Sequence, residues 1–229
     1  MCFAAQLRVK DKYNHFQLHF LNFYIPQFIH IFAHNRTKGK MHRKLKNNEL
    51  GRLTEEQFKQ AEKINVTVVL DNIRSQHNIG AAFRTSDSFL IEQIILCGCC
   101  ATPPTAEIHK SALGAEFSVD WQYTKETTDA VAALKADGYT IISIEQAENS
   151  LKLQDIAEYL SPDSNSDDMS GRKYALVFGN EVKGVQQEVV DMSDAVIEIP
   201  QFGTKHSLNI SVSLGIVLWE FCKNLKINA

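Results

Sequence analysis

The chain has 229 residues, of which 44% are apolar and 22% charged, and its formal net charge is -3. These values are typical of a soluble globular protein of one domain with extensions. The cysteines are odd in number, which excludes a complete disulfide framework and favours a reducing compartment; they are Cys2, Cys97, Cys99, Cys100 and Cys222.

The charge is distributed unevenly along the chain. Residues 1–64 carry twelve Lys or Arg and five Asp or Glu, whereas residues 65–229 carry twelve and twenty-two. A basic arm beside an acidic body favours an anionic partner for the arm, RNA being the obvious case. A basic tail that is merely solvated is the alternative interpretation.

Residues 1–40 differ from the rest of the chain. The apolar run from Phe16 to Phe32 is interrupted by polar residues and by Pro26, so neither a transmembrane helix nor a signal peptide is predicted. We expect Met41 to be the natural start, and residues 1–40 to be unstructured or an upstream extension that a wrongly assigned start codon adds. No membrane association is predicted, and the expected location is cytoplasmic.

Residues 41–64 are predicted to form a basic arm followed by a short helix. The basic cluster is His42-Arg-Lys-Leu-Lys46. Thr54 and Gln57 have the spacing of a capping box, which starts a helix that we expect to run to about Ile64. The remaining residues, 65–229, are expected to form one domain.

Strands and helices alternate in the expected order of elements after residue 64. This pattern predicts an α/β fold, with one parallel sheet and helices on both of its faces. The expected strands are 65–70, 93–97, 119–123, 139–144, 174–178 and 195–199. The expected helices are 78–89, 108–114, 127–136 and one from just after Ser207 to about Asn224. Residues 161–173 are polar and are expected to form a surface loop.

The first of these helices is expected to carry a functional arginine. Ile79, Ala82, Phe83 and Ser86 share one face at helical spacing, which predicts that this face packs inward. Arg84 lies well around from that face, so it can project into a cleft while the helix stays anchored.

The last sixty residues hold two units with the same plan, a buried strand followed by a polar turn with glycine and a helix start. The turns bend at Gly179 and Gly203, where a missing Cβ permits unusual dihedrals or close approach of a ligand. Open α/β sheets bind ligands beyond the carboxyl ends of their strands, so these loops are where chemistry is expected.

The final helix has an apolar stripe that allows two interpretations. Its members are Leu208, Val212, Ile216 and Trp219, with the small residues Ser211 and Gly215 nearby. The stripe is interpreted either as the core face of the helix or as a place where another helix or a second subunit approaches.

The predicted loops gather hydrogen-bonding groups and one strong cation: Asn78, Arg84, Glu181, Ser207 and Asn209, with Lys183 and His206 nearby. A nucleophilic Cys beside a His, a carboxylate cluster for a metal, a P-loop and a G-x-G-x-x-G fingerprint are all absent from the sequence. Cys97-Gly-Cys99-Cys100 has no second pair at zinc spacing, so burial at a strand end is favoured over a metal site. These residues by themselves indicate an enzyme or binder with a polar cleft and an anionic ligand.

Three stretches resemble the three sequence motifs of the SpoU/TrmH branch of the SPOUT RNA methyltransferases. Asn78-Ile-Gly-Ala-Ala-Phe-Arg-Thr85 resembles the first motif, and Phe178-Gly-Asn-Glu-Val-Lys-Gly184 resembles the second. Ile199-Pro-Gln-Phe-Gly-Thr-Lys-His-Ser-Leu-Asn-Ile-Ser211 resembles the third, although Gln201 stands where the family often has methionine.

The resemblance implies a fold and an activity. The fold is a SPOUT-type sheet with a deep C-terminal trefoil knot, in a homodimer with its sites at the subunit interface. The activity is metal-free transfer of a methyl group from S-adenosyl-L-methionine to a ribose 2′-OH in structured RNA. No recognisable RNA-binding domain precedes residues 65–229, and this arrangement is more similar to the tRNA guanosine-18 enzymes than to two-domain ribosomal RNA enzymes. The alternatives are ribosomal RNA as substrate, an inactive knotted RNA-binding protein, and an enzyme that acts on a small molecule.

The resemblance also implies roles for individual residues. The expected catalytic residues are Arg84, Asn78, Glu181, Ser207 and Asn209. The expected cofactor-binding residues are Phe178, Gly179, Ile199, Gln201 and Leu208. RNA binding is expected from the basic arm and the chain's end, through Arg43, Lys44, Lys46, Lys223 and Lys226.

Overall fold

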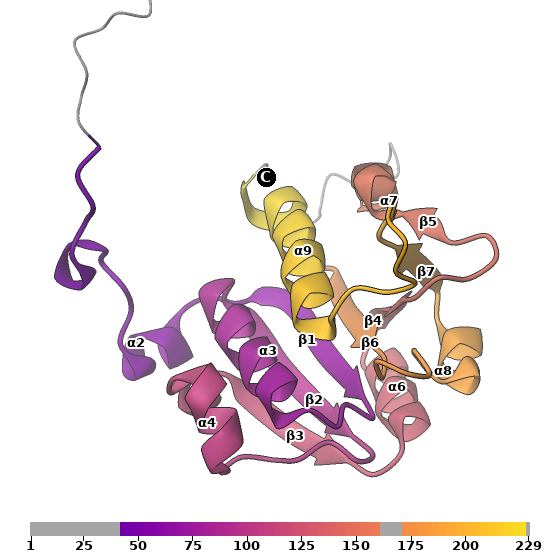
Figure 1. The fold of residues 1–229 in the computed structure, drawn as a ribbon, viewed down its shortest axis with the longest axis horizontal. Helices are drawn as coiled ribbons and strands as arrows, with labels where there is room; N and C mark the ends of the chain where they lie inside the picture. The colour runs from indigo at the N-terminus through magenta and orange to yellow at the C-terminus, as the bar shows by residue number, and fades with distance from the viewer. Residues whose placement is uncertain (1–41, 161–170, 228–229) are drawn as a thin grey trace, which may run out of the picture. The chain divides into compact units, whose positions relative to one another are not determined.

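The computed structural model describes residues 42–160 and 171–227 (Figure 1). The expected upstream extension, residues 1–40, and most of the expected polar loop lie outside the described residues. The chain divides into two units, Met1–Arg52 and Leu53–Ala229, which are described one at a time.

The described part of the first unit contains a single helical turn, η1 (Asn47–Glu49). Arg43 donates two hydrogen bonds to the Glu49 carboxylate, of 3.0 and 2.9 Å. The bonds from Arg43, and then the one from the backbone of Lys46, lower the pKa of Glu49. Part of the arm's positive charge is therefore already compensated within the arm, at Arg43.

The second unit is built on a seven-stranded sheet in the order β3-β2-β1-β6-β4-β7-β5 (Figure 1), and every strand pair in it is parallel. The strands are β1 (Ile64–Asp71), β2 (Ile91–Cys97), β3 (Asp120–Thr124), β4 (Tyr139–Ile144), β5 (Leu151–Lys152), β6 (Lys173–Phe178) and β7 (Ala195–Glu198). The predicted parallel α/β fold is confirmed, and the knot stays a prediction. The sequence did not predict β5, which is two residues long.

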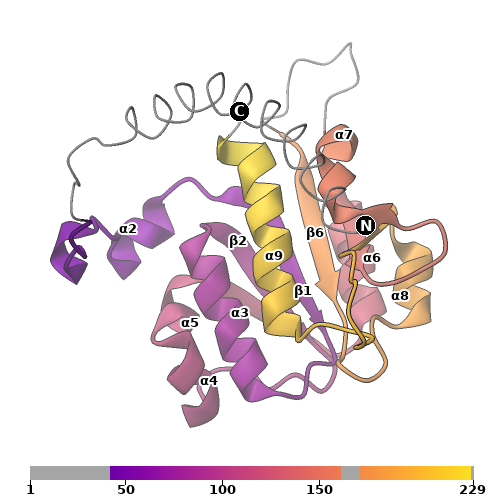
Figure 2. The ribbon, with the colours of Figure 1, turned by 45° about the horizontal axis from the view of Figure 1, so that its top comes forward.

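The helices cover both faces of the sheet (Figures 1 and 2). The α-helices are α2 (Glu55–Gln60), α3 (Gln76–Ser88), α4 (Ala106–Ala112), α5 (Ala115–Ser118), α6 (Thr127–Ala136), α7 (Ile156–Leu160), α8 (Gln187–Met192) and α9 (Ile210–Cys222). A 3-10 turn, η2 (Leu153–Asp155), precedes α7, and a π turn, η3 (Lys223–Ile227), continues α9. None of the helices in the described residues is both long and apolar enough to cross a membrane.

Two hydrophobic cores flank the sheet because side chains alternate along each strand. In β1, Val66, Val68 and Leu70 belong to the core under α3 and α9, whereas Val69 belongs to the core under α6 and α8. Figure 2 shows α3 and α9 side by side over the first face. This packing brings the start of α9 close to the start of α3, where two of the expected motifs begin and end.

The starts of α2, α3, α4 and α9 are fixed by side-chain caps. The predicted capping box is present, with Gln57 N donating to Thr54 Oγ1 (3.2 Å) and Thr54 N to Gln57 Oε1 (2.9 Å). However, α2 ends at Gln60, four residues earlier than expected. The N-cap of α3 is Ser75, so Asn78 lies inside this helix and its amide is available for other contacts.

The structure excludes one of the two interpretations of the apolar stripe on the last helix. Leu208, Val212, Ile216 and Trp219 are 37 to 52% exposed, so this stripe is not the core face. The buried residues of the helix are Ile210, Leu214, Val217, Leu218, Phe221 and Cys222. The helix also starts at Ile210, later than expected, because Asn209 is its N-cap.

Two of the three cysteines at the end of β2 serve the core, as expected, whereas Cys99 is exposed. Cys97 and Cys100 are buried, and burial raises the pKa of their thiols to about 12 and about 11. Cys100 Sγ accepts a hydrogen bond from Ile73 N (3.1 Å) and lies 3.3 Å from Leu70 O, which ties it to the end of β1. In the described part of the chain, no group of three or more His, Cys, Asp or Glu side chains is placed to hold a metal ion.

Candidate functional site

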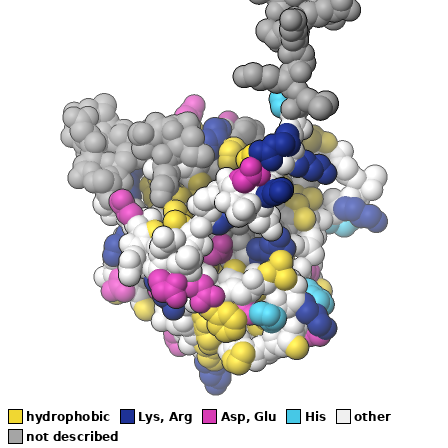
Figure 3. Space-filling model, turned by 90° about the vertical axis from the view of Figure 1, so that its left-hand side faces the viewer, with side chains coloured by type: hydrophobic (Ala, Val, Ile, Leu, Met, Phe, Trp, Pro, Cys, Tyr) yellow, Lys and Arg dark blue, Asp and Glu magenta, His cyan; other side chains and the backbone are white. Residues whose placement is uncertain are grey.

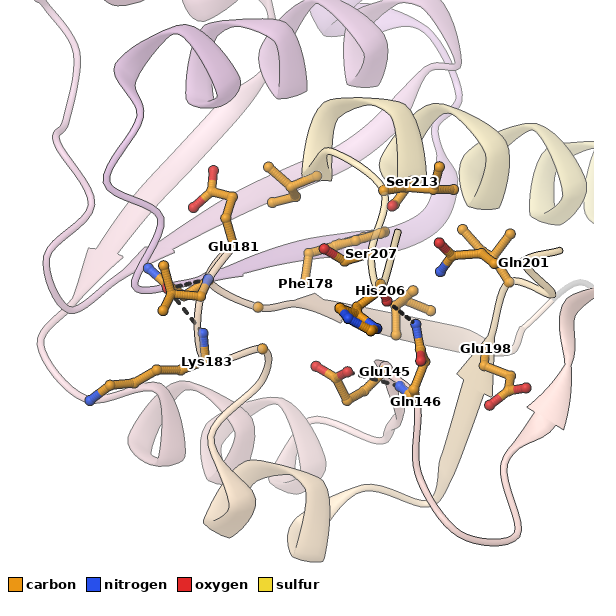
Figure 4. Close-up of a pocket in the computed structure, with 18 of the residues that line it drawn as sticks. Glu145, Gln146, Phe178, Glu181, Lys183, Glu198, Gln201, His206, Ser207 and Ser213 are labelled. Carbon is orange, nitrogen blue, oxygen red and sulfur yellow. Dashed lines mark hydrogen bonds between the residues drawn. The ribbon is translucent and has the colours of Figure 1, made fainter. Parts of the chain in front are cut away.

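A pocket of about 380 Å³ lies where β4, β6 and β7 end (Figure 4). Its walls come from the segments that follow these strands and from the start of α9. A volume of this size is within the range of roughly 300–1,000 Å³ that is usual for small-molecule sites. The position agrees with the rule that parallel sheets bind ligands beyond the carboxyl ends of their strands.

The loop after β6 forms one wall. Asn180 and Gly184 pair through two backbone hydrogen bonds, of 3.0 and 2.8 Å, and Asn180 Oδ1 accepts from the amides of Val182 (2.9 Å) and Lys183 (3.3 Å). A Cβ at Gly179 would clash with the backbone of Gly184 and Val185, so glycine is required there. This close packing gives the loop a defined shape.

All five residues expected to bind the cofactor line this pocket: Phe178, Gly179, Ile199, Gln201 and Leu208. Glu181 and Ser207, from the expected catalytic set, line it as well. Ser207 is exposed and precedes the cap of α9, and Figure 4 shows it between Phe178 and Ser213.

A chain of hydrogen bonds joins one residue from each of the three motif stretches. Asn78 Nδ2 donates to Glu181 Oε1 (2.5 Å), and Asn209 Nδ2 lies 3.4 Å from Asn78 Oδ1. Asn209 Oδ1 accepts from Ser211 N (2.9 Å), which leaves its Nδ2 as the group that faces Asn78. Glu181 therefore accepts from the Asn78 side chain, which fixes one of its carboxylate oxygens.

Arg84 is exposed on α3 and does not line the pocket. Within residues 42–160 and 171–227, no hydrogen bond or salt bridge holds its guanidinium, whereas its backbone carbonyl accepts from Ser88 Oγ (2.9 Å). The expected inward face of the same helix is confirmed, because Ile79, Ala82 and Phe83 are buried. Arg84 is thus on an anchored helix with its charge in solvent.

The expected RNA-binding residues have different surroundings. Lys44 and Lys46 are exposed, whereas Arg43 is paired with Glu49 and Lys223 is paired with Glu220 at 2.7 Å. The side chain of Lys226 lies outside the described residues.

Two pocket residues that sequence reasoning missed are Glu145 and Gln146. They follow β4 directly, and Figure 4 shows them beside His206. The strand 139–144 was predicted, so its carboxyl end was a place to look, but the sequence does not show which loop the polar pair contacts.

The charged side chains of the pocket favour a cationic ligand, and not the anionic ligand that the loop residues by themselves indicated. Three glutamates and one lysine line it, a formal balance of -2 with His206 neutral. Glu198 is paired with Lys152, and hydrogen bonds from Lys152 and then Ser150 lower its pKa. Within the described residues, Glu145 and Glu181 have no cationic partner in a salt bridge.

Comparisons with known proteins agree on one family. The model of the SpoU rRNA Methylase family matches residues 65–219. The chain is 30% identical over 156 residues, 67% of its length, to a tRNA (guanosine(18)-2'-O)-methyltransferase of Aquifex aeolicus. It is 31% identical over 153 residues, also 67% of its length, to the 23S rRNA (guanosine-2'-O-)-methyltransferase RlmB of Neisseria meningitidis serogroup B.

A solved structure extends the likeness to three dimensions. The AdoMet-bound rRNA methyltransferase of Sinorhizobium meliloti matches with a TM-score of 0.59 and 26% identity, over 72% of this chain and 59% of that one. The chain spans 66% and 56% of the lengths of the two curated relatives, less than two thirds of each. The family model nevertheless matches more than half of the chain, including all three motif stretches. The protein therefore belongs to the SpoU rRNA Methylase family.

Proposed function

We infer that this protein transfers a methyl group from S-adenosyl-L-methionine to a ribose 2′-OH in structured RNA. The observation that carries the inference is the hydrogen-bonded chain Asn209–Asn78–Glu181, which joins the three motif stretches at the edge of one pocket. The three stretches that match the motifs of this methyltransferase family are distant in the sequence but meet at one site. Their meeting supports the family's reaction in this chain.

The residues of the pocket fit the proposed methyl donor. S-adenosyl-L-methionine carries a sulfonium, an ammonium and a carboxylate, so a pocket with an excess of glutamates suits its net positive charge. Phe178, Ile199 and Leu208 provide apolar surface for its adenine, and the loop after β6 provides polar backbone groups. When bound, it supplies a methyl group that is already activated by the positive sulfur.

The chain's own residues must position the hydroxyl and ease its proton away. A ribose hydroxyl is a weak nucleophile, since it stays protonated near neutral pH. A guanidinium hardly ever gives up its proton in proteins, so Arg84 acts as a clamp for the adjacent phosphate and as a stabiliser of the developing alkoxide. The proton then leaves through the phosphate or water. Asn78 and Asn209 keep Glu181 oriented at the edge of the pocket.

The proposed substrate is tRNA, with the guanosine-18 type of methylation as the first candidate. The relatives support both this candidate and ribosomal RNA, since an enzyme of each kind matches at 30 or 31% identity. Figure 3 shows basic, acidic and hydrophobic side chains mixed on one face, without a single broad basic patch. We assign RNA attraction to the basic arm, because Lys44 and Lys46 are exposed there and belong to its cluster of positive charge.

We propose that the protein acts as a homodimer that pairs through α9. The exposed stripe Val212, Ile216 and Trp219 leaves apolar surface in contact with water. A Cβ at Gly215 would meet no atom within 4 Å, so there is open space above the backbone at that point. A second copy that covered this stripe would also lie near Arg84, because α3 packs beside α9.

Val212→Asp is expected to convert the dimer into monomers, because it buries an unpaired carboxylate in the proposed interface. Sedimentation equilibrium at micromolar concentration measures the change. Leu113→Asp is the matched control, since Leu113 is 64% exposed and lies at the end of α4. A wild-type protein that sediments as a monomer contradicts the dimer.

The function is tested by ribose-methylation mapping of tRNA and ribosomal RNA from a deletion strain, together with transfer of tritiated methyl by the purified protein. Loss of one 2′-O-methyl group that the protein restores in vitro is the expected result, and its position names the substrate. A protein that binds RNA but binds no methyl donor in calorimetry would instead be an inactive RNA-binding protein. Transfer to a small molecule alone would also contradict the proposal.

A further inference from the structure

The loop after β6 is held by carboxylates from the two strands that flank β6. The sheet order places β1 on one side of β6 and β4 on the other. Asp71, at the end of β1, accepts from Gln186 N (2.9 Å), and Glu145, just after β4, accepts from Val185 N (2.9 Å). Two successive backbone amides that follow the loop are thus each bound by a different strand end.

We propose that Glu145 and Gln146 are positioning residues for the methyl donor, because they hold the second-motif loop and the third-motif loop at a fixed separation. The proposal rests on the proposed function, since it assigns the pocket between these loops to the donor. Neither residue belongs to the three motif stretches.

Glu145 uses both carboxylate oxygens for backbone amides. Oε2 accepts from Val185 N, and Oε1 accepts from Gln146 N (2.8 Å). Its own backbone amide donates to Ile197 O in β7 (3.0 Å), which fixes the start of the segment. The carboxylate occupies the space that a Cβ at Gly184 would need, and Gly184 has a φ of +69°. The second-motif loop is therefore shaped around this side chain.

Gln146 extends the same support to the third-motif loop. Its Nε2 donates to the carbonyl of His206 (2.7 Å), as Figure 4 shows. Every residue from Gln201 to Asn209 is exposed, so few packing contacts hold this loop. One side-chain bond to its backbone therefore has a large share in fixing where Ser207 and Leu208 lie.

Glutamine at position 145 cannot reproduce the contact. A carboxylate offers two oxygen acceptors, whereas an amide offers one oxygen and an NH₂ group that would face a backbone N–H. One amide, at Val185 or at Gln146, then loses its partner and the loop gains freedom. A pocket whose walls must be ordered on binding has a lower affinity for its ligand.

The test compares Glu145→Gln and Gln146→Met with Glu148→Gln in the full chain. Glu148 lies in the same segment, is exposed and does not line the pocket, which makes it the matched control. Calorimetry with S-adenosyl-L-methionine and with its neutral product S-adenosyl-L-homocysteine measures affinity. Hydrogen exchange measures the protection of the Val185 amide.

We expect Glu145→Gln to weaken binding of both compounds about tenfold and Gln146→Met about threefold. Val185 should exchange faster in Glu145→Gln, whereas the variant should stay folded by circular dichroism and keep an RNA affinity close to wild type. Wild-type affinity in Glu145→Gln, or an equal loss in Glu148→Gln, overturns the proposal. A wild-type chain that binds neither compound overturns the proposed function itself, and with it any role of Glu145 in donor binding.

Discussion

Arg84→Ala is expected to lower the rate of methyl transfer by about 10²- to 10³-fold, the usual effect of removing one group that stabilises a developing oxyanion. The affinity for the methyl donor should stay near that of wild type, because Arg84 does not line the pocket of its own chain. The fold should also persist, since the guanidinium is exposed and the inward face of α3 is unchanged. Single-turnover transfer of tritiated methyl, beside calorimetry with the donor, measures the two effects separately.

The matched control is Arg74→Ala, which removes another exposed arginine, from the segment just before α3. This change should leave the rate within about twofold, as is usual for surface substitutions away from a site. Arg84→Lys keeps the charge but loses the planar fork, so an intermediate rate is expected if the group clamps phosphate. Full turnover by Arg84→Ala would remove Arg84 from the mechanism.

The elements that the sequence predicted well are those whose signal is local. The helix 127–136 and the strand 139–144 were predicted with the bounds that the structure has. The predicted strand 174–178 differs from β6 only in lacking its first residue, Lys173. Each is a periodic or β-branched run bounded by turn residues, so its type does not depend on distant contacts.

The last helix shows why other features could not be predicted. It is apolar on two sides, since Leu214 and Phe221 are buried while Val212 and Trp219 are exposed. Periodicity alone cannot tell which of two apolar faces meets the core, because that depends on where α3 and the sheet lie. The start of α3 was predicted two residues late for a similar reason. Ser75 and Asn78 are both good cap residues, and only the backbone conformation decides which of them caps the helix.

The site was also predicted only in part, because some of its residues depend on contacts between distant segments. The resemblance named residues in the three motif stretches, and the pocket gathers seven of them. Glu145 was missed because its role is to bind the backbone of a loop forty residues later in the chain. Its importance depends on β6 inserting between β1 and β4, a crossover that the order of elements in the sequence does not reveal.

Asp71→Ala is expected to lower the free energy of unfolding by about 3–5 kcal/mol, because it removes a buried carboxylate that several donors share. Asp71 is 0% exposed. Its Oδ1 accepts from Thr127 Oγ1 (2.6 Å) and Gln186 Nε2 (2.7 Å), and its Oδ2 accepts from Gln186 N (2.9 Å). Alanine would leave the Thr127 hydroxyl and the Gln186 amide without this acceptor, and Gln186 Nε2 would keep only its long contact with Thr127 Oγ1 (3.4 Å). Unsatisfied buried groups are costly. Urea unfolding followed by circular dichroism measures the loss.

Asp120→Ala is the control, since Asp120 is exposed at the start of β3 and should change stability by less than about 0.5 kcal/mol. Asp71→Asn keeps one oxygen acceptor, so a smaller loss is expected, and this variant remains informative if Asp71→Ala does not fold. A loss below about 1 kcal/mol in both variants would mean that water or a rearranged Gln186 replaces the carboxylate. A large loss would instead establish that the end of β1 joins α6 and α8. The loop after β6 would then be supported by Asp71 at the end of β1 as well as by Glu145 after β4. Stability and donor binding would both depend on these two strand ends.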